Sequence, residues 1–443
     1  MKSQNPISRR GFLKSTGIAL AGGGVAATPA FGPGPRQQQV QQPRIRDYRT
    51  LGRTGFDVSD IGFGTGNLTN TNVLEVALDM GVNYIDTGEH YVNGQAERTI
   101  GQAIKNRNRS SLFITTKLNL TFGGATTDEI KRRFQRCLER LQTEYVDCLM
   151  IHMAPRAEQV KHEGFHSAVE QLKAEGRVRF LGLSNHGRQH SWWGRADHAM
   201  DDVIGAAVED GRFDVALFVH NFLQREQGER IITACKSRDM GVTLMKTDPV
   251  NLYESISGTI AGWRESGREV PESRRQLARD YQSFVEQAEQ FKRQHGVESA
   301  TDARAAATKF VLGNPDVHSV CATINTFDAL ESFVAISGEK LADSDSSMLD
   351  DYEALLGRYY CRHACGICEV DCPRGVPINT IMRYNHYFEA QQREKHAMQK
   401  YAGLAAAQAD TCGACDGDCE AACPYGVPIR ALLALAHRNL TLV

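Results

Sequence analysis

The chain has 443 residues, which exceeds one ordinary domain and is long enough for a large barrel with additions. Hydrophobic residues make up 41% and charged residues 23%, the proportions of a soluble globular protein. The formal net charge of −2 gives no basic excess, so we expect neither a nucleic acid nor an anionic membrane as a partner.

The N-terminus carries a short basic motif in front of an uncharged run. Residues 8–14 read SRRGFLK, and residues 15–35 are rich in Gly and Ala, with small residues near a plausible cleavage point at Ala27 and Ala30. This pattern resembles a twin-arginine signal peptide, which the twin-arginine translocase reads on an already folded protein. We therefore expect a signal peptide over residues 1–30, a periplasmic location and no stable membrane span. An uncleaved membrane anchor is the alternative interpretation.

Residues 31–47 predict a flexible linker, because they are rich in Pro and Gln and contain few residues that could form a core. The next segment, YRTLGRTGFDVS, predicts a hairpin that closes the floor of the domain behind it.

Between residues 48 and 345, short apolar runs alternate with segments of helical period, such as residues 128–142. We expect eight strands, at residues 58–64, 82–87, 112–117, 146–152, 179–185, 215–220, 242–247 and 318–324. Eight such units predict an α/β protein with a closed (β/α)8 TIM barrel. A polar helical insert at about 251–300 predicts a solvated elaboration or a lid. An open doubly wound sheet is less favoured, because residues 62–67 lack the third glycine of a dinucleotide-binding turn.

Polar side chains stand at the ends of successive strands. Asp86 ends the second expected strand and is followed by Tyr91, Lys117 ends the third strand, and His152 ends the fourth. With these residues in this order, residues 48–340 resemble the aldo-keto reductase family. The matching motifs are Gly52-Arg53-Thr54-Gly55, Asp86-Thr87-Gly88-Glu89-His90-Tyr91 continuing through Glu97 to Gly101, Thr116-Lys117, Ile151-His152 and Gly182-Leu183-Ser184-Asn185.

The resemblance implies that the protein interconverts a small carbonyl, such as a sugar derivative, and an alcohol. Tyr91 would be the general acid and base, and the cation of Lys117 would lower its pKa. Asp86 would hold Lys117 in place, and His152 would orient the substrate oxygen. Without the family pattern, Asp86 and Lys117 would read as a buried structural ion pair and His152 as a core histidine.

The cofactor positions follow the family less closely. The resemblance assigns the carboxamide of NAD(P)H to Ser184 and Asn185. However, Leu217 stands where the family usually has a glutamine, and Lys246-Thr247-Asp248 replaces a stacking aromatic residue. Residues 322–328 contain no Arg or Lys that could pair with a 2′-phosphate. These departures argue against NADPH preference and leave nicotinamide binding open.

Eight of the twelve cysteines fall within residues 361–423, in two similar runs. The runs are Cys361-x3-Cys365-x2-Cys368-x3-Cys372-Pro373 and Cys412-x2-Cys415-x3-Cys419-x3-Cys423-Pro424. They end alike, as CPRGVPI and CPYGVPI, which indicates an internal duplication. The spacing resembles the cysteine run of bacterial ferredoxins with one residue inserted in each half, and so implies two [4Fe–4S] clusters.

In that family the cysteine before proline ligates the other cluster. The resemblance therefore assigns one cluster to Cys361, Cys365, Cys368 and Cys423, and the other to Cys372, Cys412, Cys415 and Cys419. The connecting segment reads as helical, so we expect a mainly α-helical ferredoxin-like domain over residues 355–443, here called the cysteine module. Two zinc sites and a set of disulfides are the alternatives.

Together these features predict an exported oxidoreductase whose barrel performs carbonyl–alcohol chemistry and whose clusters transfer electrons, with a redox protein as partner. One alternative is an electron-transfer subunit whose barrel is only a docking scaffold. Another is a zinc-stabilised barrel without a redox role.

Overall fold

The computed structural model describes residues 42–441 apart from residues 122–124, 192–193, 197, 251, 253, 390–392 and 405–406. The expected signal peptide and residues 31–41 of the expected linker lie outside the described residues. No helix in the described ranges is long and apolar enough to cross a bilayer.

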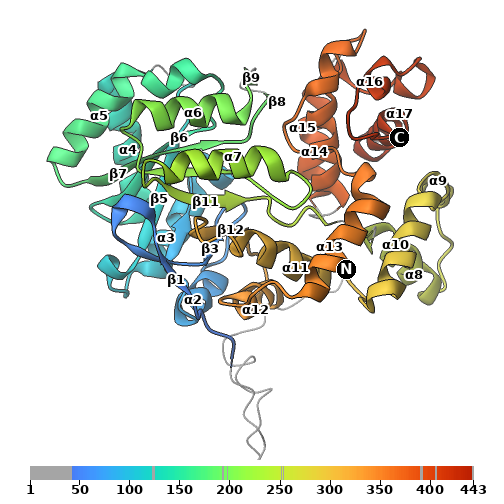
Figure 1. Cartoon of the computed structure of the whole chain (residues 1–443), viewed down its shortest axis with the longest axis horizontal. Helices are drawn as coiled ribbons and strands as arrows, with labels where there is room; N and C mark the ends of the chain where they lie inside the picture. The colour runs from blue at the N-terminus through green and yellow to red at the C-terminus, as the bar shows by residue number, and fades with distance from the viewer. Residues whose placement is uncertain are drawn as a thin grey trace, which may run out of the picture. The chain divides into compact units, whose positions relative to one another are not determined.

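Eight parallel strands close into a barrel in the order β10-β11-β12-β3-β4-β5-β6-β7 (Figure 1). They are β3 (Ile61–Gly64), β4 (Tyr84–Asp86), β5 (Phe113–Leu118), β6 (Val146–His152), β7 (Val178–Asn185), β10 (Val215–Val219), β11 (Gly241–Met245) and β12 (Ser319–Thr323). Each of the eight expected segments overlaps one of these strands, so the predicted TIM barrel is confirmed. Two further short strands, β8 (Gln189–Ser191) and β9 (Gly194–Ala196), pair with each other outside the barrel.

Helices cover the outside of the barrel. They are α2 (Thr71–Asp79), α3 (Gln95–Ile104), α4 (Thr127–Leu141), α5 (Glu163–Ala174), α6 (Met200–Asp210), α7 (Arg225–Lys236), α11 (Ala300–Leu312) and α12 (Phe327–Ile336). Helix α4 shows why the sequence folds this way. The hydroxyl of Thr126 accepts a hydrogen bond from the Glu129 amide at its start, and Gln142 ends it in the left-handed conformation. Its buried face includes Ile130, Phe134 and Leu138, which is the spacing of an amphipathic helix.

The expected hairpin is present at the amino ends of the barrel strands. Strands β1 (Tyr48–Thr50) and β2 (Asp57–Ser59) pair antiparallel. Between them, Gly52 has a φ of +46°, and a Cβ there would lie 2.5 Å from the carbonyl oxygen of Asp239, just before β11. The hairpin therefore packs tightly against the amino ends of the strands.

The linker prediction is wrong for its last residues. Ile45 is buried, and its amide donates to the carbonyl of Met80 over 2.9 Å. The Arg46 amide donates to the hydroxyl of Ser337 over 2.8 Å, and its guanidinium pairs with Glu339. One apolar side chain and a set of backbone partners are enough to fix this stretch along the barrel.

The insert between β11 and β12 forms α8 (Glu254–Glu265), α9 (Glu272–Asp280) and α10 (Gln282–His295). It is not simply a solvated elaboration, because Phe284 and Phe291 of α10 are buried. The ring of Phe291 packs edge-on against Tyr352 of α13 (Asp343–Leu356) at a centroid distance of 5.4 Å. The insert therefore shares a second hydrophobic core with the C-terminal helices.

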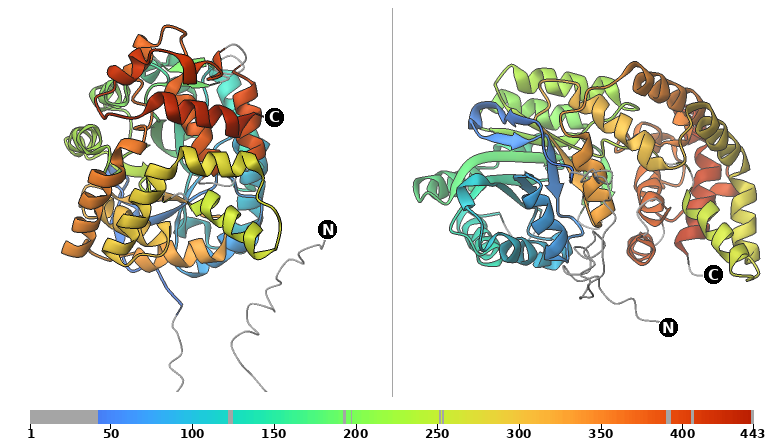
Figure 2. Two further views of the ribbon diagram at one scale, coloured as in Figure 1. Left: turned by 90° about the vertical axis from the view of Figure 1, so that its right-hand side faces the viewer. Right: turned by 90° about the horizontal axis from the view of Figure 1, so that it is seen from below.

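The described part of the cysteine module contains helices and turns and no strand. Its longer helices are α14 (Ile378–Glu389), α15 (Glu394–Ala402) and α17 (Ile429–Leu440), and a short helix, α16 (Asp418–Ala421), lies among the second cysteines. Figure 2 shows these helices beside those of the insert, in agreement with their common core. The predicted helical character is present, whereas the ferredoxin-like nature of the module stays a prediction.

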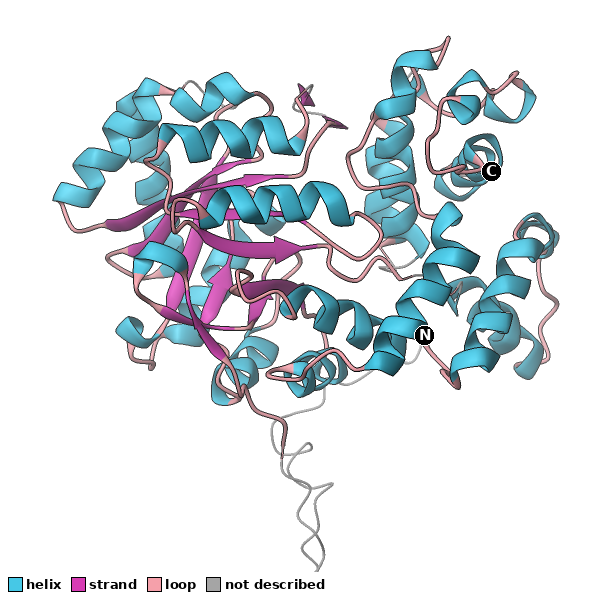
Figure 3. Ribbon diagram, viewed as in Figure 1, coloured by secondary structure: helices cyan, strands magenta, loops and turns pink. Residues whose placement is uncertain are grey.

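The cysteine module packs against the carboxyl ends of the barrel strands, a face here called the barrel mouth. The guanidinium of Arg362 donates to the carbonyl of Leu223 over 3.1 Å, and the amide of Gln224 donates to the carbonyl of His363 over 3.1 Å. The ring of His363 lies 5.6 Å from that of His186, which follows β7. In Figure 3 the arrowhead of β11 points toward these C-terminal helices. TIM-barrel active sites form on this face.

Candidate active site

Three of the predicted residues meet at the barrel mouth. The ammonium of Lys117, at the end of β5, donates to Asp86 Oδ1 over 2.5 Å and to the Thr87 carbonyl over 2.6 Å. Its Nζ lies 3.5 Å from the hydroxyl of Tyr91. The sequence expectation that Asp86 holds Lys117 beside Tyr91 agrees with this geometry.

His152, at the end of β6, completes the group. Its ring lies 5.6 Å from the ring of Tyr91 at an interplanar angle of 74°. A Cβ added to Gly88 would lie 3.6–3.7 Å from atoms of Lys117, Tyr91 and His152, so these side chains converge around one glycine. His152 Nδ1 is buried without a hydrogen-bond partner among the described residues. A buried polar atom of this kind is free to bind a ligand.

Burial controls the protonation of two of these groups. It raises the pKa of Tyr91 to about 12, although the Lys117 cation pulls in the opposite direction. The expectation of a net lowering is therefore not met, because desolvation of the phenolate outweighs the neighbouring charge. Burial, and then the Lys117 charge, lower the pKa of His152 to about 3. Both side chains are neutral near pH 7.

Lys117 keeps its charge despite complete burial. Burial opposes the ammonium form, but Asp86 at 2.5 Å and then Tyr91 raise its pKa above the usual value. A buried cation is stable only with such a partner. The site therefore offers a neutral phenol beside a fixed positive charge.

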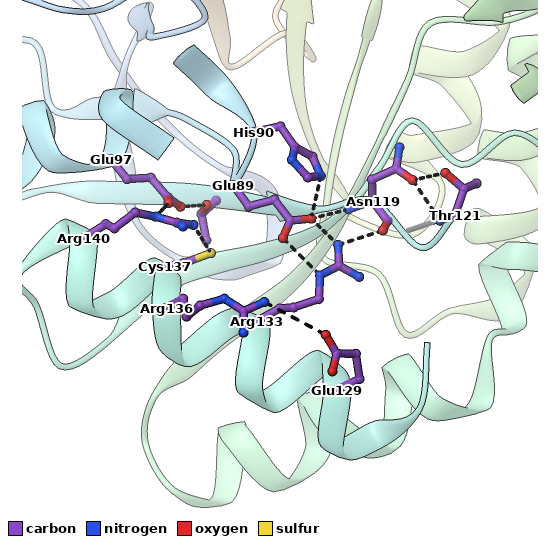
Figure 4. A network of polar contacts seen from close by, with 11 residues as sticks. Glu89, His90, Glu97, Asn119, Thr121, Glu129, Arg133, Arg136, Cys137 and Arg140 are labelled. Carbon is purple, nitrogen blue, oxygen red and sulfur yellow. Dashed lines mark hydrogen bonds and ion pairs between the residues drawn. The ribbon is translucent and has the colours of Figure 1, made fainter. Parts of the chain in front are cut away.

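A polar network fixes the loop that carries Tyr91 (Figure 4). The guanidinium of Arg133, on α4, donates to both carboxylate oxygens of Glu89, with 3.0 Å between Arg133 Nε and Glu89 Oε2. The same carboxylate accepts from the Asn119 amide over 3.0 Å, and Arg133 also donates to the Asn119 carbonyl over 2.8 Å. All three residues are buried, so the loop after β4 is tied to α4 and to the end of β5.

A second network supports the same strand from outside. The hydroxyl of Thr116 donates to Glu97 Oε1 over 2.7 Å, and Arg140 Nε donates to Glu97 Oε2 over 2.6 Å (Figure 4). Glu97 lies on α3 and Arg140 on α4, and Thr116 directly precedes Lys117. These contacts hold α3 and α4 against β5, the strand that carries Lys117.

Comparison with known proteins identifies the barrel. The model of the aldo/keto reductase family matches residues 60–354, more than half of the chain. The chain belongs to the aldo/keto reductase family. Oxidoreductase YqkF of Bacillus subtilis is 31% identical over 149 residues, which are 31% of this chain and 48% of that protein.

Two Arabidopsis thaliana proteins match a similar portion. A probable voltage-gated potassium channel subunit beta is 30% identical over 185 residues (38% of this chain, 55% of that protein). L-galactose dehydrogenase is 29% identical over 154 residues (31% and 48%). The chain thus spans about half the length of the curated relatives it matches. The holo form of an aldo-keto reductase from Bacillus halodurans superposes with a TM-score of 0.51 at 20% identity, over 72% of this chain and 99% of that one, which shows the fold alone.

The two residues that the family resemblance assigns to a nicotinamide carboxamide lie at the end of β7, but their polar atoms are engaged elsewhere. The hydroxyl of Ser184 accepts from the Met153 amide over 3.2 Å. Asn185 donates to the Ala154 carbonyl over 2.7 Å and accepts from the Gly187 amide over 2.6 Å. Both side chains are only 1% exposed. These contacts fit a structural role and do not fit a carboxamide site.

The remaining cofactor positions of this family member also differ, as the sequence indicates. Leu217 is buried in β10 and offers no polar group. Lys246 follows β11 with a φ of 56° and stands at the sequence position where the family usually has a stacking aromatic residue. These positions therefore differ from the usual cofactor contacts of the family, and nicotinamide binding stays an open question.

The first set of cysteines forms one neighbourhood. Burial raises the pKa of Cys361, and the thiols of Cys365 and Cys368 raise it further. Cys423, from the second run, raises the pKa of both Cys365 and Cys368. The side-chain amide of Asn379 donates to the Cys361 sulfur over 3.3 Å. Neighbouring thiols thus act on one another within this set, and its assignment to one cluster stays a prediction.

The cysteines of the second set also act on one another. Burial, and then Cys415, Cys372 and Cys419, raise the pKa of Cys412 to about 11. These four cysteines line a common pocket. The Val376 amide donates to the Cys372 sulfur over 3.4 Å.

All twelve cysteines are free in the structure. Within the described ranges, no three Cys, His, Asp or Glu side chains stand close enough together to hold one metal ion. The cluster ligands therefore stay predictions.

Sequence reasoning missed three residues around the mouth. His186 and Lys246 follow β7 and β11, and Arg383 comes from α14 of the cysteine module. Their charges act on one another, since Lys246 and Arg383 both lower the pKa of His186 after burial does. The position of Lys246 at a strand end was the available signal. Nothing in the sequence indicated that Arg383 would reach the barrel.

Proposed function

We propose that this protein is an exported aldo-keto reductase-type oxidoreductase. It interconverts a small carbonyl and an alcohol at the barrel mouth, and its electrons pass through two [4Fe–4S] clusters in the cysteine module. One observation carries the proposal. Asp86, Tyr91, Lys117 and His152 converge on the same barrel face against which the cysteine module packs.

The chain's own residues supply the proton chemistry. During carbonyl reduction, the Tyr91 hydroxyl donates its proton to the oxygen on which negative charge develops. The Lys117 ammonium, 3.5 Å away, stabilises the phenolate that remains. Neutral His152 hydrogen-bonds the substrate oxygen. In alcohol oxidation the same groups act in reverse.

The electron count matches two one-electron carriers. Reduction of one carbonyl to one alcohol consumes two electrons and two protons. A [4Fe–4S] cluster, when bound, transfers single electrons. Two clusters can therefore hold the pair needed for one turnover, and Tyr91 and solvent supply the protons.

The arrangement of cysteines supports clusters over single zinc ions. In a cubane each cysteine binds a different iron, so the four sulfurs stand farther apart than the ligands of one ion. The two runs of four cysteines, each ending in Cys-Pro, supply four ligands for each expected cluster. Amides of Asn379 and Val376 donate to cysteine sulfurs, as is useful for a negatively charged cluster.

Export by the twin-arginine pathway is part of the proposal. The SRRGFLK motif and a cofactor that is inserted before export support each other, because this pathway carries folded proteins. A periplasmic enzyme has no access to the cytoplasmic nicotinamide pool. A redox partner protein therefore delivers or removes the electrons, in keeping with the departures at the usual cofactor positions.

Anaerobic purification of the full chain tests the proposal directly. We expect a brown protein with about eight irons per chain and no bound nucleotide. Stoichiometric zinc without iron would refute the clusters. One nicotinamide nucleotide per chain would show that the hydride comes from a nucleotide instead.

A second function is favoured by Leu217 and Lys246, which depart from the family at cofactor positions. In that case the chain is an electron-transfer subunit whose barrel is a docking scaffold. The two functions differ in one respect, since only the enzyme needs the hydroxyl of Tyr91.

A further inference from the structure

A pocket lies between the insert and the cysteine module, and none of the four residues proposed for catalysis lines it. Its wall is rich in aromatic side chains from both parts of the chain, namely Tyr281, Phe284, Tyr352, Tyr359 and Tyr360. The ring of Phe284 lies 4.9 Å from that of Tyr359 and 6.0 Å from that of Tyr281. The insert and the module thus form one aromatic surface, on which a flat ring can pack.

His363 gives this pocket a polar side. Its side chain is only 4% exposed, and neither of its ring nitrogens has a hydrogen-bond partner among the described residues. A neutral imidazole carries one donor and one acceptor. Buried polar groups in folded proteins are almost always paired, so the unpaired ring of His363 indicates that a ligand completes its hydrogen bonds.

Arg383, on α14, adds a second donor to the pocket. Its guanidinium donates a hydrogen bond to the hydroxyl of Tyr360, which holds the side chain against the aromatic wall. Its Nε is buried and has no partner within the described ranges. An arginine can only donate, so the group that completes this site is an acceptor such as a carbonyl oxygen. Unpaired donors beside flat apolar walls are typical of a small-molecule site.

One cysteine also lines the pocket. Cys361 belongs to the first expected cluster, whereas Cys365, Cys368 and Cys423 of the same set are not among the residues that line it. The four cysteines of the second set, by contrast, all line a pocket of their own. The space beside Cys361 is therefore not the place of a cluster but a cavity next to one. A redox-active ligand in it is close to the expected path of the electrons.

We propose that this pocket binds a quinone, a flat ring with carbonyl acceptors, as a small-molecule electron carrier for the cysteine module. The ring packs on the aromatic wall, and the carbonyl oxygens accept hydrogen bonds from His363 and Arg383. The inference rests on the proposed function only for the source of the electrons, because binding of the quinone does not depend on turnover at Tyr91.

The redox step balances with the alcohol oxidation of the proposed function. Oxidation of one alcohol to a carbonyl breaks one C–H and one O–H bond and releases two electrons and two protons. The quinone takes up two electrons, by way of the clusters when these are bound, and each of its two carbonyl oxygens gains a proton from solvent. The product is the hydroquinone, and the module returns to its oxidised state. Carbonyl reduction runs the same sequence backwards.

Equilibrium dialysis of the full-length protein, purified anaerobically and kept oxidised, tests the proposal with duroquinone and durene. Both probes are six-membered rings with four methyl groups, and they differ in the two carbonyl oxygens of the quinone. Duroquinone has no free ring position to which a thiol could add. We expect one duroquinone to bind per chain and durene to bind about tenfold more weakly, the size of a lost hydrogen bond. Equal affinities, or no binding of duroquinone, would overturn the proposal.

Variants locate the site. His363→Phe keeps a ring but removes both nitrogens, and it should lose most of the preference for duroquinone. His396→Phe is the matched control, because His396 is a half-buried histidine of α15 that does not line the pocket. Met382→Trp fills the pocket and should weaken the binding of both probes. Met382 lies outside both cysteine runs, so this variant decides the question even if His363→Phe disturbs the neighbouring cysteines. Full binding in Met382→Trp, or an unchanged preference in His363→Phe, would place the quinone elsewhere.

Tyr91→Phe separates this inference from the proposed function. The variant should bind duroquinone as tightly as the wild type, since Tyr91 does not line the pocket. If the wild type binds duroquinone with the expected preference but turns over neither aldehydes nor alcohols, the proposed reaction is refuted and the quinone site stands. Anaerobically reduced wild type that binds duroquinone without forming the hydroquinone would contradict the role as an electron carrier.

Discussion

At the scale of single residues, burial decides the protonation of Tyr91 and His152 at the barrel mouth. A phenol with a pKa of about 12 and an imidazole with a pKa of about 3 are both neutral across the physiological range. In the proposed reaction, Tyr91 therefore carries its proton across this range, and the charge of Lys117 would stabilise the phenolate.

Tyr91→Phe should lower turnover by about 10² or more, the contribution of one positioned acid. The ring and its packing stay, so the unfolding free energy and the iron content should not change. Tyr84→Phe is the matched control, because Tyr84 is a buried barrel tyrosine whose hydroxyl lies 3.5 Å from the Thr243 hydroxyl. Wild-type turnover in Tyr91→Phe would favour the alternative function, in which the barrel is only a docking scaffold.

Neither Tyr91 nor His152 should titrate between about pH 5 and pH 9. The rate of carbonyl reduction should therefore show no change in this range that is due to either group. The sign follows from the shifts. Tyr91 stays protonated until the pH approaches about 12, and His152 stays neutral until the pH falls toward about 3. Steady-state rates with an artificial electron donor measure this. An ionisation near pH 6.5 that disappears in His152→Gln would contradict the neutral histidine.

The Asp86, Tyr91, Lys117 and His152 group could be predicted because each residue stands at or just after a strand end in the family's order. The protonation of Tyr91 could not be predicted, since the sequence shows the charged neighbour but not the degree of burial. The position of Arg383 near the barrel could not be predicted for a different reason. It depends on how a separate helical module packs on the barrel.

At the scale of elements, the strands were predictable because their runs of buried apolar residues are bounded by polar helices. The buried face of the insert, which includes Phe284 and Phe291, was not predicted, because the segment is rich in Glu, Arg and Gln. The loop after β4 depends on a buried ion pair that only the structure reveals.

Arg133→Met should reduce the free energy of unfolding by about 3 kcal/mol, because it leaves the buried Glu89 carboxylate without its main partner. Turnover should fall as well, since the loop also carries Tyr91. Arg136→Met, on the exposed face of the same helix, should change stability by less than about 0.5 kcal/mol. Denaturant unfolding of both variants measures the difference, and equal stabilities would show that the network has no such role.

The same ion pair predicts acid sensitivity. Burial would raise the pKa of Glu89, but hydrogen bonds from His90 and Arg133 lower it from the usual 4.5 to about 2. A carboxylate whose folded pKa is depressed adds stability above pH 4.5, and this stability is lost as the pH falls toward 2.

At the scale of the whole molecule, the chain combines a family barrel with a module that covers its mouth. Gln224 and Arg362 join the two through backbone carbonyls, and the insert contributes to their common core. The duplicated cysteine runs made the module visible in the sequence. Its position over the active-site face could not be foreseen, because no local pattern encodes the packing of one domain on another.

Cys372→Ser should lower the iron content from about eight to about four per chain, because it removes a ligand of one cluster only. Cys235→Ser is the control, since Cys235 is a buried barrel cysteine and should leave the iron content unchanged. Iron and acid-labile sulfide analysis of anaerobic samples gives the result. A full iron content in Cys372→Ser would exclude that cysteine as a ligand.

Replacement of Arg9 and Arg10 by Lys should keep the precursor in the cytoplasm, because the arginine pair is the recognised feature of the signal. Cell fractionation and immunodetection measure this. Undiminished secretion of the double variant would remove the export assignment.

The central claim is that carbonyl chemistry at Tyr91 draws its electrons from the cysteine module. The most direct test is to reduce the full-length, nucleotide-free protein anaerobically, remove the reductant and mix it with a small aldehyde that it turns over, while recording the visible absorption of the clusters. The account predicts reoxidation in the wild type, with one alcohol formed for every two electrons lost, and none in Tyr91→Phe. Clusters that stay reduced until NADH or NADPH is added, or that reoxidise equally in Tyr91→Phe, would contradict it.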